Sequence, residues 1–124
     1  MLINRRHLLI GSSAFGLSLS SSTVFGQARP RVLVIGGGPG GATAAKYIAK
    51  DSKGAIDVTL IEPSKQFVTC FHSNLYLGGF KDMKSITFGY GALKDHGVKV
   101  VHQRVMMIDR EKKQVILDDN SHMA

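Results

Sequence analysis

Residues 31–62 read RVLVIGGGPGGATAAKYIAKDSKGAIDVTLIE, and this stretch decides the fold. The apolar run Val32–Ile35 leads into a cluster of glycines, and four consecutive apolar residues are typical of a strand buried on both faces. Residues 42–50 place alanines on one face, which predicts a helix packed closely on a sheet. A second strand is predicted at Asp57–Ile61. A strand, a glycine turn, a helix and a second strand form the βαβ unit of a dinucleotide site.

The glycine cluster has the spacing G-x-G-x-x-G, formed by Gly36, Gly38 and Gly41. We expect Gly36 to permit a tight turn, Gly38 to let a diphosphate approach the backbone, and Gly41 to let the helix pack against the strand. The start of the helix, with Pro39 and the amide groups of Gly40 and Gly41, is predicted to face the anion. The helix dipole would then stabilise the negative charge of the diphosphate.

An acidic residue, Glu62, closes the second strand, 21 residues after Gly41. In this position a carboxylate can accept hydrogen bonds from ribose hydroxyls and would repel a 2′-phosphate, which disfavours NADP. A purely structural glycine turn would not explain Glu62. The sequence therefore predicts dinucleotide binding, and redox chemistry on a bound flavin or nicotinamide is the first reaction class to consider.

The first 28 of the 124 residues are predicted to be a signal peptide, with Arg5 and Arg6 before the apolar run 8–19 and small residues at 26–28. The apolar run is too short and too rich in serine and glycine for a stable membrane span. An ordinary membrane anchor or a disordered start is the alternative. The arginine pair resembles a twin-arginine signal, although serine or threonine is more usual where Asn4 stands, and it predicts export to the periplasm.

Residues 29–124 hold fourteen of the sixteen basic residues and all nine acidic ones, which gives this part a formal charge of +5. The basic residues are scattered singly apart from Lys112-Lys113, so a solvated surface is favoured over nucleic-acid binding. The positive charge could help to dock an acidic partner protein. Residues 118–121 are predicted to be a turn with nothing after it, and we expect 29–124 to be the amino-terminal part of a larger, truncated domain.

The rest of the chain gives less regular patterns. Residues 64–79 are unusually apolar for a loop and have no clear period, so we expect a ligand or a neighbouring chain to cover them. A helix is predicted at 84–96 with Gly97 as its cap. A third strand, parallel to the first two, is predicted at 98–102. A hairpin of two short strands is predicted at 105–108 and 114–117.

The chain has one cysteine, Cys70, which cannot form a disulfide within this sequence. It could be a small buried hydrophobic residue, or its partner could lie outside the sequence. A third hypothesis is a thioether to a flavin. Cys70 follows Glu62 by eight residues, and a loop of that length can return along the cofactor toward its ring.

The segment around this cysteine, FVTCFHSNLYLGG at 67–79, resembles the flavin-linking segment of the flavoprotein subunit of flavocytochrome c sulfide dehydrogenase. In that family a threonine-cysteine pair precedes two variable residues, then Ser-Asn, and later Gly-Gly. The resemblance continues through 86–90 and 93–102 and covers nearly all of 30–118. It implies that Cys70 carries FAD through the 8α-methyl group, within a Rossmann-like βαβ domain of the three-layer FAD/NAD(P)-binding type, an α/β fold, here incomplete and with a small β-hairpin.

The resemblance also implies an activity. A periplasmic enzyme would oxidise sulfide, pass two electrons to FAD, and release them singly to a c-type haem on a cytochrome partner subunit. The haem motif C-x-x-C-H does not occur in this sequence, so the haem must be carried elsewhere. The family's redox-active cysteine pair lies in later sequence, so no catalytic residue is assigned here, and His72 occupies a variable position.

Two alternatives stay open. One is a flavoprotein resembling sulfide:quinone oxidoreductase, which a membrane-binding amphipathic segment would support, and no such segment is visible. The other is an inactive truncated chain that folds as part of a Rossmann domain and at most binds a nucleotide. No metal site is predicted.

Overall fold

The computed structural model describes residues 28–124, so the predicted signal peptide lies outside the described residues except for Ala28. The elements follow the sequence prediction through the first βαβ unit, differ from it within residues 62–97, and agree with it again at the third parallel strand and the hairpin. In chain order they are β1 (Arg31–Ile35), α1 (Pro39–Asp51), β2 (Asp57–Ile61), β3 (Gln66–Val68), α2 (Ser73–Leu77), the 3₁₀ helix η2 (Met83–Ile86), β4 (Thr87–Gly89), α3 (Gly91–Lys94), β5 (Val98–Val101), β6 (Val105–Asp109), β7 (Gln114–Leu117) and β8 (His122–Met123).

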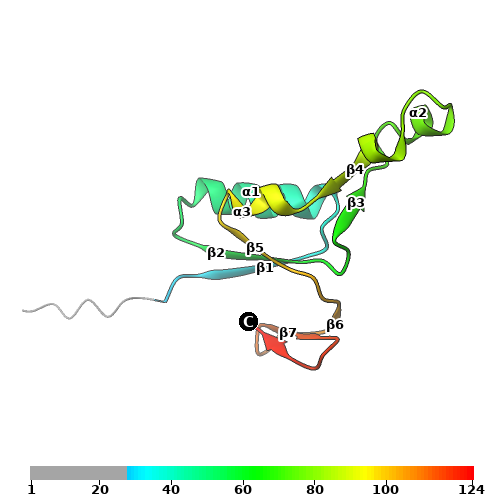
Figure 1. Ribbon diagram of the computed structural model, residues 1–124. Coiled ribbons are helices and arrows are strands. Elements are labelled where there is room, and N and C mark those ends of the chain that lie inside the picture. Colours follow the sequence, from blue (N-terminus) through cyan, green and yellow to red (C-terminus); the bar gives the residue numbers. More distant parts are fainter. Residues whose placement is uncertain (1–27) are drawn as a thin grey trace, which may run out of the picture.

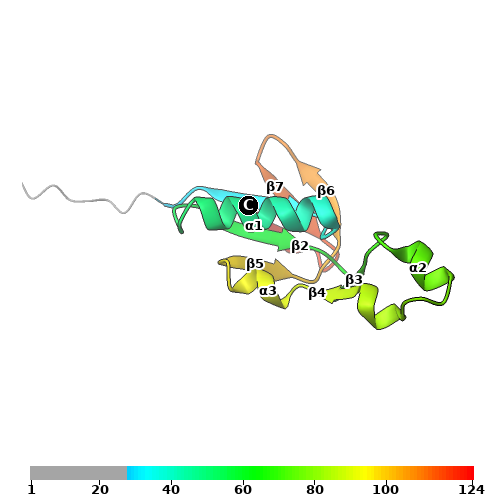
Figure 2. The same ribbon diagram turned by 90° about the horizontal axis from the view of Figure 1, so that it is seen from above.

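The centre of the fold is a parallel sheet with strand order β1-β2-β5. Val34 pairs with Leu60, which pairs in turn with Val100, so the carboxyl ends of the three strands meet at one edge. Helices α1 and α3 cover one face of this sheet, and the antiparallel strands β6, β7 and β8 cover the other (Figure 1, Figure 2). The expected α/β fold with three layers is confirmed.

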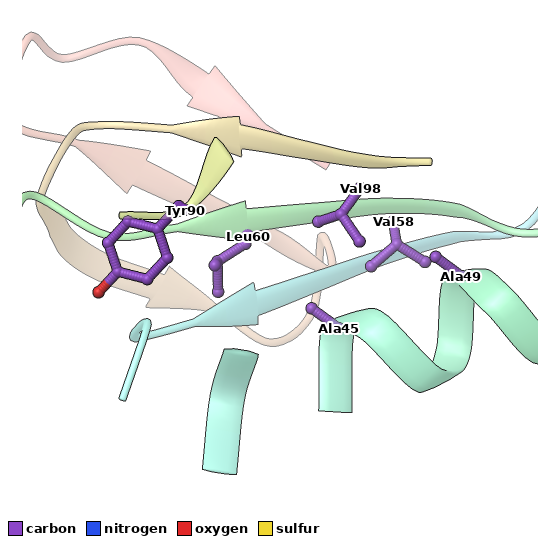
Figure 3. Packing of buried hydrophobic residues seen from close by; sticks show 6 residues of the cluster. All are labelled: Ala45, Ala49, Val58, Leu60, Tyr90 and Val98. Carbon is purple, nitrogen blue, oxygen red and sulfur yellow. The ribbon is translucent and has the colours of Figure 1, made fainter. Parts of the chain in front are cut away.

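Alternation along β2 divides the core between the two faces of the sheet. Val58 and Leu60 are 2% and 0% exposed and pack toward Ala45 and Ala49 of α1 (Figure 3). Ile61 points the other way and packs with buried side chains of β7. Small alanines at the helix contact let α1 lie close to the sheet, as the spacing of 42–50 predicts.

Strand β1 differs from its prediction in burial. The run Val32–Ile35 is indeed a strand, but its middle residues are only half-buried and Ile35 is 47% exposed. Within residues 28–124, β1 pairs only with β2. It is therefore an edge strand of the sheet and not a strand buried on both faces.

An arm formed by β3, α2, η2 and β4 projects from the three layers (Figure 1, Figure 2). The prediction of a helix at 84–96 is wrong. Residues 87–89 instead pair antiparallel with β3, with Phe67 opposite Phe88, and α3 is a single turn. The apolar spacing of this segment favours a helix, but Gly89 and Gly91 lower its helix propensity. Pairing with β3 within the arm makes 87–89 a strand instead. The apolar loop 64–79, expected to be covered, is largely exposed here, at 60% for Phe71 and 83% for Leu77.

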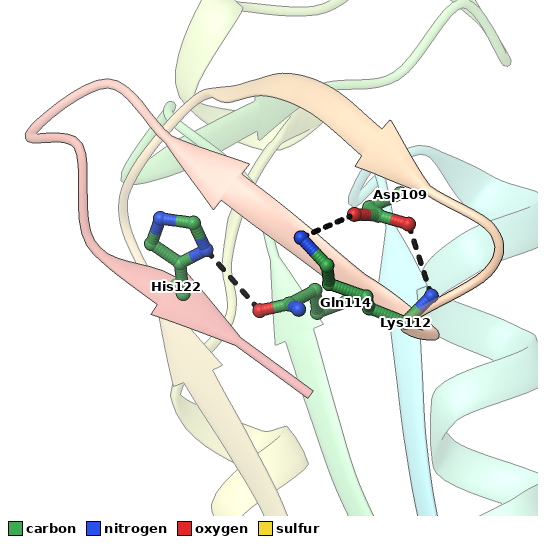
Figure 4. A network of polar contacts seen from close by, with 4 residues as sticks. All are labelled: Asp109, Lys112, Gln114 and His122. Carbon is green, nitrogen blue, oxygen red and sulfur yellow. Dashed lines mark hydrogen bonds and ion pairs between the residues drawn. The ribbon is translucent and has the colours of Figure 1, made fainter.

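The hairpin β6–β7 forms where it was predicted. Its turn is closed by Asp109, which accepts a hydrogen bond from the Lys112 backbone N–H at 2.9 Å and pairs with the Lys112 ammonium at 3.5 Å (Figure 4). The turn at 118–121 is followed by a short strand, β8, contrary to the prediction of nothing after it. β8 pairs with β7, and His122 Nδ1 lies 3.1 Å from Gln114 Oε1.

Among residues 28–124, no helix combines the length and apolar character that crossing a bilayer requires.

Candidate functional site

The glycine turn leaves β1 at the carboxyl edge of the sheet. Gly36 adopts φ +94°, a conformation that favours glycine, and its N–H donates to the Ile61 carbonyl at 2.9 Å. Gly38 is extended and caps α1, where its carbonyl accepts from the Ala42 N–H at 2.9 Å. A Cβ built on Gly38 would meet no heavy atom within 4 Å. The chain therefore leaves open space at the position predicted to receive a diphosphate.

The start of α1 has the geometry of an anion site. Pro39 occupies the first helical position, where a missing N–H costs nothing. The N–H groups of Gly40 and Gly41 lie in the first turn of α1, where no carbonyl of the helix accepts them. They therefore carry the positive end of the helix dipole. A Cβ on Gly41 would overlap the Gly36 carbonyl oxygen. The third glycine is therefore required for close packing of the helix on the turn, as predicted.

Glu62 lies directly after β2, beside the turn. Its Oε2 accepts the Gly37 N–H at 2.7 Å and its Oε1 accepts the Ser64 N–H at 2.9 Å. Partial burial opposes ionisation of Glu62, but these two N–H donors and the nearby His102 outweigh it, so its pKa lies below the ordinary value. An ionised carboxylate offers about four acceptor positions, so about two are left for the hydroxyls of a ribose.

Two aromatic residues of this edge were not predicted as site residues. His102 follows β5, and its Nδ1 lies 3.0 Å from the Glu62 carbonyl oxygen. Tyr90 is buried and donates its hydroxyl to the Gly37 carbonyl at 3.1 Å, with its ring centroid 6.0 Å from that of His102. Tyr90 falls within the helix wrongly predicted at 84–96, and no local pattern marks a contact with a residue 53 positions earlier.

A cavity of about 310 Å³ extends from the glycine turn toward the arm. One end is formed by the turn and the start of α1, and the other by β3, β4 and residues close to Cys70. The lining includes Gly37, Gly38, Pro39, Thr43, Phe67, Thr69, Phe71, Phe88 and Tyr90. Its size lies at the lower limit of ligand pockets, and its aromatic walls suit a planar apolar group.

Cys70 lies in the turn between β3 and α2. The residues on either side of it line the cavity, whereas Cys70 does not, and its side chain is exposed. Thr69 is buried, and its hydroxyl accepts the Phe71 N–H at 3.1 Å, which holds the turn. The cysteine is therefore not a buried hydrophobic residue, and that hypothesis is wrong.

No group of three or more His, Cys, Asp or Glu side chains suited to hold a metal ion occurs within residues 28–124.

The three-layer fold agrees with comparisons against known proteins. Residues 30–123 match the family described as pyridine nucleotide-disulphide oxidoreductase, and the chain belongs to this family. Among curated relatives, the sulfide dehydrogenase (flavocytochrome c) flavoprotein chain of Chlorobaculum thiosulfatiphilum is 57% identical over 44 residues, which are 36% of this chain and 90% of that sequence. The resemblance found in the sequence is confirmed.

Two solved structures share the fold. The sulfide:quinone oxidoreductase of the hyperthermophilic bacterium Aquifex aeolicus superposes with a TM-score of 0.66 and 22% identity, and covers 76% of this chain. An engineered water-forming NADPH oxidase, solved with NADPH bound, superposes with a TM-score of 0.60 and 22% identity over 75% of this chain. The chain spans 22% of the length of each of these two proteins.

Proposed function

We propose that this chain holds FAD in an oxidoreductase that takes electrons from sulfide. The observation that carries the proposal is the cavity that joins the diphosphate turn to the residues around Cys70. The family assignment supports a flavin-linked oxidoreductase, and the 57% identity to a sulfide dehydrogenase flavoprotein chain supports the sulfide substrate.

The chain's residues fit the nucleotide half of FAD. The amide groups of Gly40 and Gly41 would bind the diphosphate, and open space at Gly38 admits it. Glu62 would accept the ribose hydroxyls, and its charge would exclude a 2′-phosphate. The low pKa of Glu62 keeps it ionised at neutral pH, which both roles require.

The aromatic end of the cavity would receive the flavin ring. Phe67, Phe71 and Phe88 offer apolar surfaces there. We propose that Cys70, between Thr69 and Phe71, bonds the 8α-methyl carbon. This step replaces the thiol hydrogen and one methyl hydrogen by an S–C bond. It is a two-electron oxidation in which the flavin ring takes up both electrons and both hydrogens, and the electron acceptor of the enzyme would then reoxidise the ring.

The bound flavin would supply two-electron chemistry toward sulfide and single-electron transfer to an acceptor. We propose a c-type cytochrome subunit as that acceptor, two haem irons taking one electron each per sulfide oxidised. The formal charge of +5 on residues 29–124 suits an acidic partner surface. The identity to the flavocytochrome c relative favours this acceptor over quinone, since the likeness to the quinone-linked enzyme is at 22% identity.

We further propose that the protein is exported to the periplasm by the twin-arginine route, on the evidence of Arg5-Arg6 and the apolar run that follows. A folded protein carrying FAD is the kind of cargo that this route exports. Replacement of both arginines by lysine should leave the protein in the cytoplasmic fraction, and an unchanged distribution would contradict the proposal.

The nucleotide site is tested by titrating the chain with FAD and following flavin fluorescence. ADP should compete with FAD, whereas adenosine 2′-phosphate 5′-diphosphate, which differs from ADP only by the added 2′-phosphate, should compete at least about tenfold more weakly, because Glu62 repels that 2′-phosphate. In Glu62→Gln the difference between the two nucleotides should shrink, whereas the matched control Glu111→Gln, in the exposed turn before β7, should keep it. Equal competition by both nucleotides would contradict the assigned role of Glu62.

The acceptor is tested separately, by adding sulfide to the FAD-loaded protein with a c-type cytochrome or with a soluble quinone. Faster reduction of the cytochrome supports the proposal. Faster reduction of the quinone would favour the sulfide:quinone oxidoreductase alternative, and reduction of neither would favour the alternative of a nucleotide-binding chain without activity.

A further inference from the structure

Both peptide groups of one residue in the glycine turn are held by side chains from other elements. The Gly37 N–H donates to Glu62 Oε2 at 2.7 Å, and the Gly37 carbonyl accepts from the Tyr90 hydroxyl at 3.1 Å. Gly37 itself is buried. With both groups fixed, rotation of the peptide planes around Gly37 would break one bond or the other, so the turn is held in one conformation.

The second of these side chains is rigidly placed. Tyr90 is 8% exposed and belongs to the core cluster between α1 and the sheet, with Leu60 (Figure 3). It also caps α3, where its carbonyl accepts the Leu93 N–H at 3.1 Å. Burial, together with the negative charge of Glu62, raises the pKa of Tyr90, so the hydroxyl remains protonated and able to donate.

Packing at this point also explains a glycine that the G-x-G-x-x-G spacing does not require. A Cβ on Gly37 would lie 2.6 Å from the Tyr90 hydroxyl oxygen and 2.7 Å from its ring atoms Cε1 and Cζ. Gly37 has no positive φ that would demand glycine. Glycine is therefore favoured at this position because a Cβ would collide with the buried Tyr90 ring.

We propose that Tyr90 is a positioning residue for the diphosphate-binding turn. By fixing the Gly37 carbonyl, Tyr90 would hold Gly38 and the start of α1 in the conformation that presents the Gly40 and Gly41 amides to an anion. Glu62 would serve twice, as the partner of the Gly37 N–H and as the acceptor for the ribose. The inference rests on the proposed function, because it assumes that a nucleotide diphosphate binds at this turn.

The test compares ADP with adenosine, which lacks the diphosphate, in titrations of the full chain followed by NMR chemical shifts. Tyr90→Phe removes only the hydroxyl and should weaken ADP binding about fivefold, while adenosine binding stays within about twofold of the wild type. Tyr47→Phe, at an exposed tyrosine of α1, is the matched control and should change neither.

Each result decides the inference. Unchanged ADP affinity in Tyr90→Phe, or equal weakening of ADP and adenosine, would overturn it, since equal weakening indicates a purely structural role. A wild-type chain that binds neither ligand would instead overturn the proposed function, and the inference with it.

A second pair of variants covers the case in which Tyr90→Phe does not fold. The Cβ added by Gly37→Ala would collide with the Tyr90 ring and displace the turn, so this variant should weaken ADP binding more than adenosine binding. Gly91→Ala, where an added Cβ meets nothing within 4 Å, should leave both unchanged. ADP binding by Gly37→Ala at wild-type strength would overturn the inference.

Discussion

Replacing Glu62 by glutamine removes one charge and one acceptor from the turn while keeping the shape of the side chain. The amide oxygen can still accept the N–H of the buried Gly37, which is the costlier donor to leave unpaired. The amide NH₂ then faces the Ser64 N–H, which is exposed and can bind water instead. Loss of the charge-assisted bonds should therefore lower the free energy of unfolding at pH 7 by about 1 to 2 kcal/mol.

The pH dependence of this difference is the sharper part of the prediction. The pKa of Glu62 is lowered in the folded chain, so that chain binds fewer protons than the unfolded chain just below the ordinary glutamate pKa of about 4.3. The stabilisation is complete above the ordinary value and disappears as the pH falls through the lowered one. Protonated Glu62 resembles glutamine, so wild type and Glu62→Gln should converge at low pH.

The assay is urea unfolding followed by circular dichroism at several pH values, since the chain has no tryptophan. In thermal unfolding at pH 7 the Glu62→Gln variant should melt about 4 to 16 °C lower than the wild type. Glu111→Gln should match the wild type throughout. A gap between wild type and Glu62→Gln that stays the same from pH 7 to pH 3 would refute the reasoning, because it would not depend on the charge of Glu62.

The remaining predictions concern packing. Gly41→Ala should destabilise the fold by about 2 to 3 kcal/mol, because its Cβ overlaps the backbone oxygen of Gly36. Gly40→Ala, with nothing within 4 Å, should be neutral or stabilising by at most about 1 kcal/mol. Urea unfolding that ranks these two variants equally would contradict the close approach of α1 to the turn. Leu60→Ala, at a fully buried core position, should cost about 2 to 5 kcal/mol, whereas Leu77→Ala, which is 83% exposed, should cost less than about 0.5 kcal/mol. A similar loss of unfolding free energy in both variants would contradict the assignment of Leu60 to the core.

The first βαβ unit could be predicted because its signals are local. Apolar runs define β1 and β2, alanine spacing defines α1, and Gly36 and Gly41 are required by the backbone itself. The arm could not be predicted, because β4 exists only through pairing with β3, where Phe88 lies opposite Phe67 from much earlier in the chain. Helix α2 is only five residues long, too short to show a period.

The candidate site, like the fold, could be predicted only where its signals are local in the sequence. Glu62 follows from its distance to the glycines, and Cys70 from the resemblance around it. The roles of Tyr90 and of Gly37 depend on a contact between residues 53 positions apart, and no sequence pattern indicates it. The binding of a cofactor by these residues stays a prediction.

The most direct test of the account is whether FAD becomes bonded to Cys70. The protein should be produced with residues 1–28, the proposed export signal, then precipitated in acid, digested and analysed by mass spectrometry. The account predicts that flavin stays with the precipitate, that the peptide containing Cys70 carries the mass of FAD less two hydrogens, and that Cys70→Ser releases all flavin into the supernatant. Flavin that dissociates from the wild-type protein in acid, with an unmodified Cys70 peptide, would contradict it.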